Sequence, residues 1–131
     1  MKRSIVFLMV FALFTGIESI AQKAEVLYFK ANLACCQARS CNALETDVKA
    51  AVEKSFTNGD VSFKVLKLAD EANKKLVEKY HAKSQTVVVV ATKRKKETSV
   101  DISDIIRDYS RNRNKDLLEQ NLIAKVKECM K

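Results

Sequence analysis

Short apolar runs alternate with amphipathic segments along this chain, and their spacing predicts the order of strands and helices. The run at 26–29, Val-Leu-Tyr-Phe, indicates a buried strand at 26–30. From Cys41 onward, apolar residues return every three or four positions, which predicts a helix over 42–56. That helix is expected to stop at the turn Asn58-Gly59, and residues 31–40 are expected to be irregular.

The middle of the chain repeats the same alternation. Apolar and polar residues alternate from Val61 and predict a strand at 61–68. Asp70 stands where an N-cap belongs, ahead of a helix predicted at 71–82. Four consecutive valines then predict a strand at 86–92 whose two faces are both covered, so this strand should lie inside the sheet.

The last third of the chain predicts a hairpin and two helices. The basic run Lys93–Lys96 links the valine strand to a strand at 98–102, and Ser103 can cap the helix that follows. A final helix carries one apolar stripe, which consists of Leu118, Leu122, Val126 and Cys129. The order β-α-β-α-β-β-α favours parallel neighbours in its first connections and an antiparallel closing hairpin.

This order of elements, with cysteines after the first strand, is typical of the thioredoxin-like fold among small domains. The expected fold class is therefore α/β, with a central mixed sheet of about four strands flanked by helices. The sequence contains no repeat and no linker, so one domain is expected over residues 22–131.

The first 21 residues have the pattern of an export signal. Lys2 and Arg3 give a positive start, and the apolar run at 5–14 is shorter than the about 20 residues of a membrane-spanning helix. Ser19-Ile20-Ala21 offers small residues at the cleavage positions. We therefore expect a signal peptide at 1–21 and a periplasmic or secreted protein that leaves the membrane after cleavage; the alternative is an uncleaved membrane anchor.

The chain is basic, with a formal net charge of +8 over 131 residues. Basic chains can bind nucleic acid, but export argues against such a partner. The densest basic run, Lys93–Lys96, is interpreted as the solvated tip of the predicted hairpin. No nucleic-acid partner and no cofactor are expected.

Three cysteines within seven residues are the strongest chemical signal: Cys35, Cys36 and Cys41. They follow a strand and precede a helix, and the positive end of a helix stabilises a thiolate. Helical residues five apart, such as Cys36 and Cys41, lie about 140° apart around the axis and roughly 7.5 Å apart along it. Because a disulfide needs Cα atoms within about 7 Å, either the helix begins near Cys41 and 35–40 form a loop that folds back, or these cysteines do not pair. We expect the first arrangement, with Cys129 apart in the core.

Three chemistries fit such a cluster. The first is thiol–disulfide exchange, and the second is a structural disulfide with one spare thiol in an adaptor that has no catalytic role. The third is a soft-metal or arsenite site on Cys35, Cys36 and Cys41, since thiolates select soft centres.

The chain resembles the ArsF family, small exported thioredoxin-like proteins labelled as a nitrophenyl-compound nitroreductase subunit and often associated with arsenical efflux genes. The strand at 26–29 resembles the family's Val-Tyr-Tyr-Phe opening, and Cys41-Asn42-Ala43-Leu44-Glu45 matches its helix start, Cys-x-Ala-Ile-Glu. Further matches follow in order over nearly all of the mature chain: Phe63-Lys64-Val65-Leu66, Glu78-Lys79-Tyr80, the valine strand and Tyr109-Ser110-Arg111. The resemblance implies a thioredoxin-like redox protein linked to arsenic resistance.

Only Cys41 carries over residue by residue from the family pattern, as the second or resolving cysteine. The family's first cysteine falls on Ala38, so the nucleophile role passes by inference to Cys36 or Cys35. Thioredoxins also place a cis-proline before the central strand, where this chain has Gln85 and contains no proline at all. A trans connection is expected there, because a cis bond without proline costs about 3 kcal/mol.

These observations lead to one main hypothesis. The chain is expected to be an exported thiol–disulfide redox protein with a non-standard Cys-Cys-x4-Cys cluster, in which Cys36 or Cys35 attacks and Cys41 resolves. Its partner is expected to be a redox protein or a thiol substrate. The alternatives are a thiol module that binds a soft metal or arsenite, and an adaptor with a structural disulfide.

Overall fold

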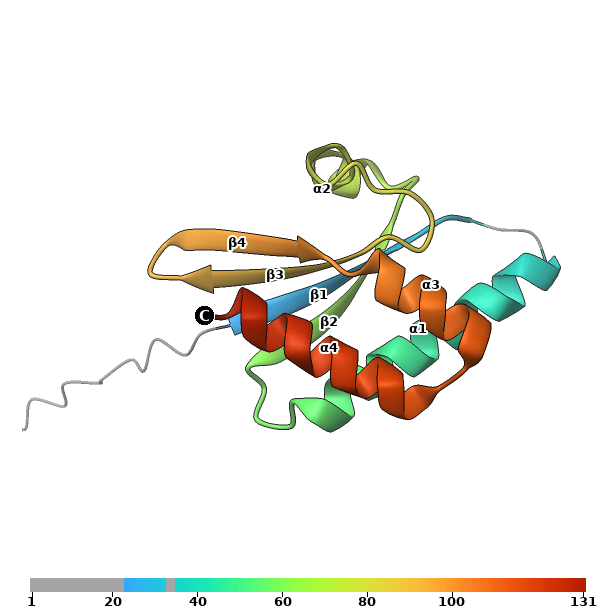
Figure 1. Ribbon diagram of the computed structural model, residues 1–131. Helices are drawn as coiled ribbons and strands as arrows, with labels where there is room; N and C mark the ends of the chain where they lie inside the picture. Colours follow the sequence, from blue (N-terminus) through green and yellow to red (C-terminus); the bar gives the residue numbers. More distant parts are fainter. Residues whose placement is uncertain (1–22, 33–34) are drawn as a thin grey trace, which may run out of the picture.

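The computed structural model describes residues 23–32 and 35–131, which form one sheet with helices on both of its faces (Figure 1). The predicted signal peptide at 1–21 lies outside the described residues. Among the described residues, no helix is both long enough and apolar enough to cross a bilayer. The elements follow one another as β1 (Lys23–Lys30), α1 (Cys35–Ser55), β2 (Val61–Lys67), the 3-10 turn η1 (Glu71–Asn73), α2 (Lys74–Lys79), β3 (Val87–Lys93), β4 (Lys96–Asp101), α3 (Ser103–Asn112) and α4 (Lys115–Cys129).

The four strands lie in the order β2-β1-β3-β4. β1 runs parallel to β2, whereas β3 is antiparallel to both of its neighbours, β1 and β4. β3 therefore lies inside the sheet, as its four valines predicted. The predicted thioredoxin-like fold class, with a mixed four-stranded sheet flanked by helices, is confirmed.

Parallel pairing was predicted for the first connections, and it holds for β1 and β2 but is wrong for β3. β2 ends opposite Lys30, at the carboxyl end of β1, and β3 begins opposite Tyr28 at that same end. The segment between β2 and β3 therefore begins and ends at the same end of the sheet, the carboxyl end of β1. β3 must then run in the opposite direction.

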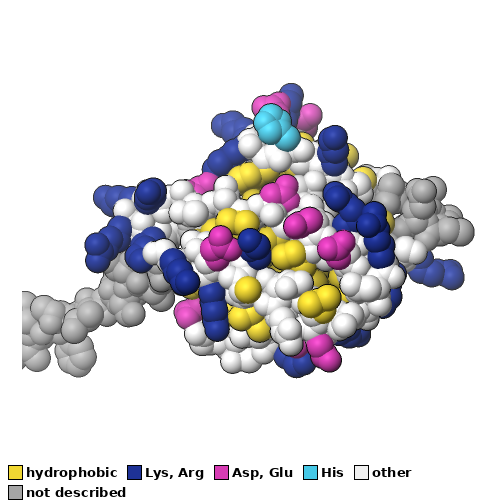
Figure 2. Space-filling view, in the orientation of Figure 1, with side chains coloured by type: hydrophobic (Ala, Val, Ile, Leu, Met, Phe, Trp, Pro, Cys, Tyr) yellow, Lys and Arg dark blue, Asp and Glu magenta, His cyan; other side chains and the backbone are white. Residues whose placement is uncertain are grey.

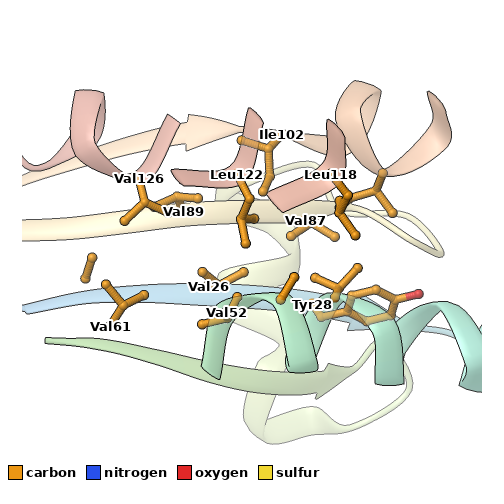
Figure 3. Close-up of a cluster of buried hydrophobic side chains, with 14 of the residues drawn as sticks. Val26, Tyr28, Val52, Val61, Val87, Val89, Ile102, Leu118, Leu122 and Val126 are labelled. Atoms are coloured by element: carbon orange, nitrogen blue, oxygen red, sulfur yellow. The ribbon is translucent and has the colours of Figure 1, made fainter. Parts of the chain in front are cut away.

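The two faces of the sheet carry cores of different size. α1, α3 and α4 cover one face (Figure 1), where Val26, Val89 and Leu122 are completely buried between the layers (Figure 3). On the other face, Phe29 packs with a smaller group that includes Leu76 of α2. Since burying one such side chain contributes about 1.5–3 kcal/mol, most of the packing energy lies on the first face.

The last helix, α4, and the β3–β4 hairpin agree with the sequence-based predictions. The stripe of α4 is buried, and Cys129 at its end is only 5% exposed. Lys93 and Lys96 face each other across the β3–β4 hairpin, so Arg94 and Lys95 form its tip. The basic run is therefore an exposed hairpin tip, as predicted.

The helix predicted at 71–82 is shorter than expected. Asp70 Oδ1 accepts a hydrogen bond from the amide of Ala72 at 3.1 Å, so the predicted cap is confirmed. A 3-10 turn follows, and α2 has six residues and ends at Lys79. His81 then adopts a φ of +47°, which a continuing helix does not allow.

α1 begins at Cys35, six residues before the start that was predicted near Cys41. The apolar periodicity does not reach into 35–40, which is why a loop was expected there. However, this segment has no Gly, Pro, Asn or Asp, and its Gln-Ala-Arg at 37–39 are strong helix formers. The predicted return loop is wrong, and the backbone places all three clustered cysteines on one helix.

Candidate functional site

The site lies where the carboxyl end of β1, the start of α1 and the loop before β3 meet. Two backbone hydrogen bonds fix this loop to β1: the Gln85 amide donates to the Phe29 carbonyl at 2.9 Å, and the Phe29 amide donates to the Thr86 carbonyl at 2.8 Å. The peptide bonds of the described residues are all trans, which confirms the expected trans connection at Gln85. The loop is thus held as an extension of the sheet.

Gln85 has a left-handed backbone with a φ of +65°. A residue with a Cβ pays roughly 1–2 kcal/mol for this conformation, so the surrounding bonds must hold it in place. The Gln85 side chain lies over α1, where Nε2 donates a hydrogen bond to the Cys41 sulfur at 3.0 Å. The strained position therefore brings an amide donor to a cysteine.

Cys41 is a free thiol on the sheet-facing side of α1, and it is 6% exposed. Leu44 and Val48 follow at helical spacing and are also buried, so the amphipathic pattern of α1 turns the sulfur inward. A hydrogen-bond donor aimed at an ionisable group favours its charged form. The Gln85 amide is therefore placed to stabilise negative charge on this sulfur.

Tyr28 of β1 brings a buried hydroxyl group within electrostatic reach of Cys41. The side chain is 1% exposed, and its oxygen has no hydrogen-bond partner among the described residues. Burial raises the pKa of Tyr28 far above its ordinary value, and the negative charges of Cys41 and Glu45 add to this shift. A buried hydroxyl without a partner costs about 1–3 kcal/mol, so the site contains an unused donor within electrostatic reach of Cys41.

An ion pair joins β1 to α1 near the site. Lys30 Nζ, at the end of β1, lies 2.7 Å from Glu45 Oε2 on α1, and both side chains are partly exposed. Exposed pairs contribute up to about 1 kcal/mol. The pair fastens the start of α1 to β1 beside the buried sulfur.

Cys35 and Cys36 belong to the first turn of α1 by their backbone, and their side chains lie outside the part that the structure describes. The first turn of a helix carries partial positive charge, which favours a thiolate. Along an α-helix, Cys36 and Cys41 are separated by roughly 7.5 Å of rise and about 140° of rotation. A bond between these two sulfurs therefore requires the first turns of α1 to unwind.

Cys129 belongs to a different region, as predicted. Its thiol lies under the β3–β4 hairpin, 3.3 Å from the Thr98 carbonyl and 3.6 Å from the Val89 carbonyl. Cys41 instead lies beside the loop that precedes β3. The stripe of α4 thus uses Cys129 as a core residue.

No group of three metal-ligating side chains is found among the side chains that the structure describes. The proposed soft-metal site on Cys35, Cys36 and Cys41 includes two side chains outside that part, so it stays a prediction.

Sequence reasoning missed two contributors, Gln85 as a side-chain donor and Tyr28 as a spare hydroxyl. A signal for each was present. Gln85 is a polar residue directly before the most apolar strand, and Tyr28 is the one hydroxyl in a buried strand run, where a partner is usually required.

Comparisons with known proteins give similarity at the level of the fold. No protein-family model matches the chain, and no curated protein matches it. Among solved structures, the chain is similar to the solution structure of a thioredoxin from Thermus thermophilus, with 14% sequence identity and a TM-score of 0.46 over 71% of this chain and 75% of that chain. The resemblance to the ArsF family stays a prediction.

Proposed function

We propose that this chain is an exported thioredoxin-like protein that exchanges thiols and disulfides through Cys35, Cys36 and Cys41. The observation that carries the proposal is the surroundings of Cys41: a free, buried sulfur on the sheet-facing side of α1 that accepts an amide hydrogen bond at 3.0 Å. Structural cysteines in apolar surroundings are inert. A sulfur that accepts an N–H bond is instead prepared for the negative charge that it carries when it attacks or leaves.

The proposed exchange has two steps. The thiolate of Cys36, or of Cys35, attacks one sulfur of a partner disulfide; a mixed disulfide forms, and the other partner sulfur leaves with the electron pair as a thiolate. The Cys41 thiolate then attacks the sulfur of Cys36, forms the Cys36–Cys41 bond and releases the second partner thiolate. The chain loses two electrons and the partner gains them, while water supplies the protons that the released thiolates take up.

The second step needs a change in α1. We expect residues 35–40 to leave the helical conformation when Cys41 resolves the mixed disulfide, because a helix holds the two Cα atoms too far apart. The first turn is the easiest part of a helix to unwind, since its amides have no partner within the helix. The sulfur of Cys41 can stay in place, because it is held by Gln85 and by the buried face of α1.

The resemblance to the ArsF family supports the same proposal, since it gives Cys41 the role of the resolving cysteine. On this proposal the partner is a redox protein or a thiol substrate, met in the periplasm or outside the cell. The family's association with arsenical efflux genes extends the proposal to arsenic resistance.

The test is to map the thiols of protein purified from the periplasm by alkylation and mass spectrometry, with and without reductant. We expect Cys36 or Cys35 to be alkylated fastest near neutral pH, and Cys41→Ser to keep a mixed disulfide with its partner because the resolving thiol is missing. Cys129→Ser is the matched control and should trap nothing. Slow alkylation of all four cysteines, together with no trapped species in Cys41→Ser, would reject the redox proposal.

The alternatives give different results in the same preparation. Arsenite or copper(I) binding that is lost with any one of the three clustered cysteines, without a trapped species, would identify a soft-metal module. A reduction potential below about −300 mV would identify a structural disulfide.

A further inference from the structure

A cavity of about 460 Å³ lies between the β3–β4 hairpin and the end of α4. In Figure 1 the carboxyl end of α4 lies beside this hairpin, on the face of the sheet away from α2. The cavity is remote from Cys41 and plays no part in the proposed thiol exchange. Its volume falls in the range of about 300–1,000 Å³ that is typical of small-molecule sites.

The floor of the cavity is apolar and fixed. It includes Ala91 of β3 and Cys129 of α4, which are 4% and 5% exposed. The Cys129 thiol lies 3.3 Å from the Thr98 carbonyl of β4, so the end of α4 is joined to the hairpin across the floor. This surface can accept an apolar group but offers little to a polar one.

The rim of the cavity is cationic. Four positively charged side chains line it, and no acidic side chain does: Lys93, Arg94, Lys96 and Lys131. In the described part of the chain, none of the ion pairs involves these four residues. Figure 2 shows the dark-blue side chains gathered at this end of the molecule.

The acidic residues nearest in sequence have other partners. Glu97 pairs with Lys79 and accepts a hydrogen bond from Tyr80 at 3.1 Å, on the α2 side of the sheet. Glu128 pairs with Lys125 at 3.0 Å. Within the cavity, Lys93 Nζ donates a hydrogen bond to the main-chain oxygen of Lys131 at 2.9 Å. Among the described residues, no acidic side chain pairs with Arg94, Lys96 or the Lys131 ammonium.

The two basic residues at the hairpin tip adopt a left-handed backbone, which is unfavourable for residues that carry a Cβ. Arg94 and Lys95 have φ values of +47° and +67°, as a two-residue hairpin turn of the primed type requires. Asn-Gly is the sequence that adopts this turn most easily. Strain of this kind is typical of functional positions, and here it keeps Arg94 on the rim of the cavity.

We propose that this cavity binds a small organic anion. Its apolar body would lie on the floor formed by Ala91 and Cys129, and its carboxylate or other anionic head would lie among the four cations of the rim. A concave site lined by one sign of charge raises the local concentration of the opposite charge. The apolar floor adds selection for anions that carry a hydrophobic group.

The direct test uses 2-naphthoate as the probe and uncharged 2-naphthamide as its matched control. The chain contains no tryptophan, so the fluorescence of the probe can be followed against a low background. We expect the naphthoate to bind, the amide to bind at least about tenfold more weakly, and the naphthoate affinity to fall with added salt. Bound naphthoate should also slow the alkylation of Cys129 by N-ethylmaleimide and leave that of the clustered cysteines unchanged.

A pair of variants separates the cavity from the overall charge of the chain. Arg94→Asn/Lys95→Gly provides the favoured turn and removes two positive charges at the tip; it should fold at least as well as the parent chain and bind naphthoate about three- to tenfold more weakly. Lys74→Gln/Lys75→Gln removes the same charge from the exposed face of α2 and should leave binding unchanged. The proposal is overturned by equal binding of naphthoate and naphthamide, by equal losses in the two variants, or by no naphthoate binding at millimolar concentration.

Discussion

Cys41 and Cys129 are buried to nearly the same extent, 6% and 5% exposed, and both are free thiols. The two cysteines differ in the partners that lie closest to their sulfur atoms. The Cys41 sulfur accepts an N–H from Gln85 at 3.0 Å, whereas the Cys129 thiol donates toward the carbonyls of Thr98 and Val89 at 3.3 and 3.6 Å. Burial alone therefore does not distinguish the two cysteines, but their nearest partners do: a side-chain amide at Cys41 and two main-chain carbonyl groups at Cys129.

The difference has a chemical meaning. Burial raises the pKa of Cys129, a backbone hydrogen bond at Ala91 partly offsets this shift, and the charge of Glu128 adds to it. Carbonyl groups stabilise the protonated thiol, so Cys129 is a core residue that retains its proton. Cys41 instead accepts a hydrogen bond from the Gln85 side-chain amide and lies within electrostatic reach of the Tyr28 hydroxyl group.

Gln85→Pro should disturb the Cys41 region most strongly. Proline fixes φ near about −65°, but Gln85 has a φ of +65° and its amide donates to the Phe29 carbonyl. We expect a loss of at least about 2 kcal/mol in the free energy of unfolding, measured in urea at pH 7. Gln85→Gly accepts the positive φ and should keep the stability while removing the donor to Cys41. A proline variant as stable as the parent chain would contradict the geometry of this loop.

Alkylation rates test the comparison directly. In a Cys35→Ser/Cys36→Ser chain, only Cys41 and Cys129 remain. Although their exposure is similar, we expect N-ethylmaleimide to modify Cys41 faster at pH 7.5, because the Gln85 amide donates to its sulfur whereas the Cys129 thiol lies against two carbonyl groups. Mass spectrometry of timed samples gives both rates. Adding Gln85→Leu should bring them closer together, and equal rates without that change would refute the proposed difference.

The pH dependence of stability should single out Cys129. Its raised pKa means that the folded chain keeps this proton where the unfolded chain loses it, so the contribution is complete below the ordinary thiol value of about 8.5 and is lost as pH rises above it. Urea unfolding of the parent chain and of Cys129→Val should therefore differ by a constant amount between pH 6 and 8. Toward pH 10 the parent chain should lose stability relative to the variant. A difference that stays constant up to pH 10 would contradict the assignment.

Tyr28→Phe should have the smallest effect on stability. Its hydroxyl has no partner among the described residues, so its removal should change the free energy of unfolding by less than about 0.5 kcal/mol or should stabilise the fold. Tyr109→Phe is the matched control, because the Tyr109 hydroxyl donates to Asp47 Oδ2 at 2.7 Å and its loss should cost about 1–3 kcal/mol. If the Tyr28 hydroxyl serves the thiolate of Cys41, Tyr28→Phe should also slow the alkylation of that cysteine. A large loss of stability in Tyr28→Phe would instead reveal a structural partner.

The parts of the fold that could be predicted are those in which the apolar residues form a continuous run or a regular stripe. Four valines in succession located the interior strand, and the stripe ending at Cys129 located the buried side of α4. The start of α1 was missed because residues 35–40 carry no apolar stripe, and helix propensity alone decides their conformation.

The candidate site was predictable only in part, because its contacts join elements that are distant in sequence. Cys41 could be found from its place after a strand, and the trans connection at Gln85 followed from the absence of proline. The contact of the Gln85 side chain with Cys41 spans 44 residues and depends on the φ of one loop residue. Periodicity carries no information about such a contact.

The thin cover on the second face of the sheet has a consequence for the motions of this protein. α2 has six residues, fewer than the about 12–15 that an isolated helix needs, so it depends on the packing of Leu76 and its neighbours against the sheet. We expect amide hydrogens of η1, α2 and the loop at 83–86 to exchange with solvent deuterium well before those of β3 and α4. Each such local opening would expose the smaller core around Phe29 and Leu66 while the larger core stays closed. The two faces of one sheet would then meet solvent at very different rates.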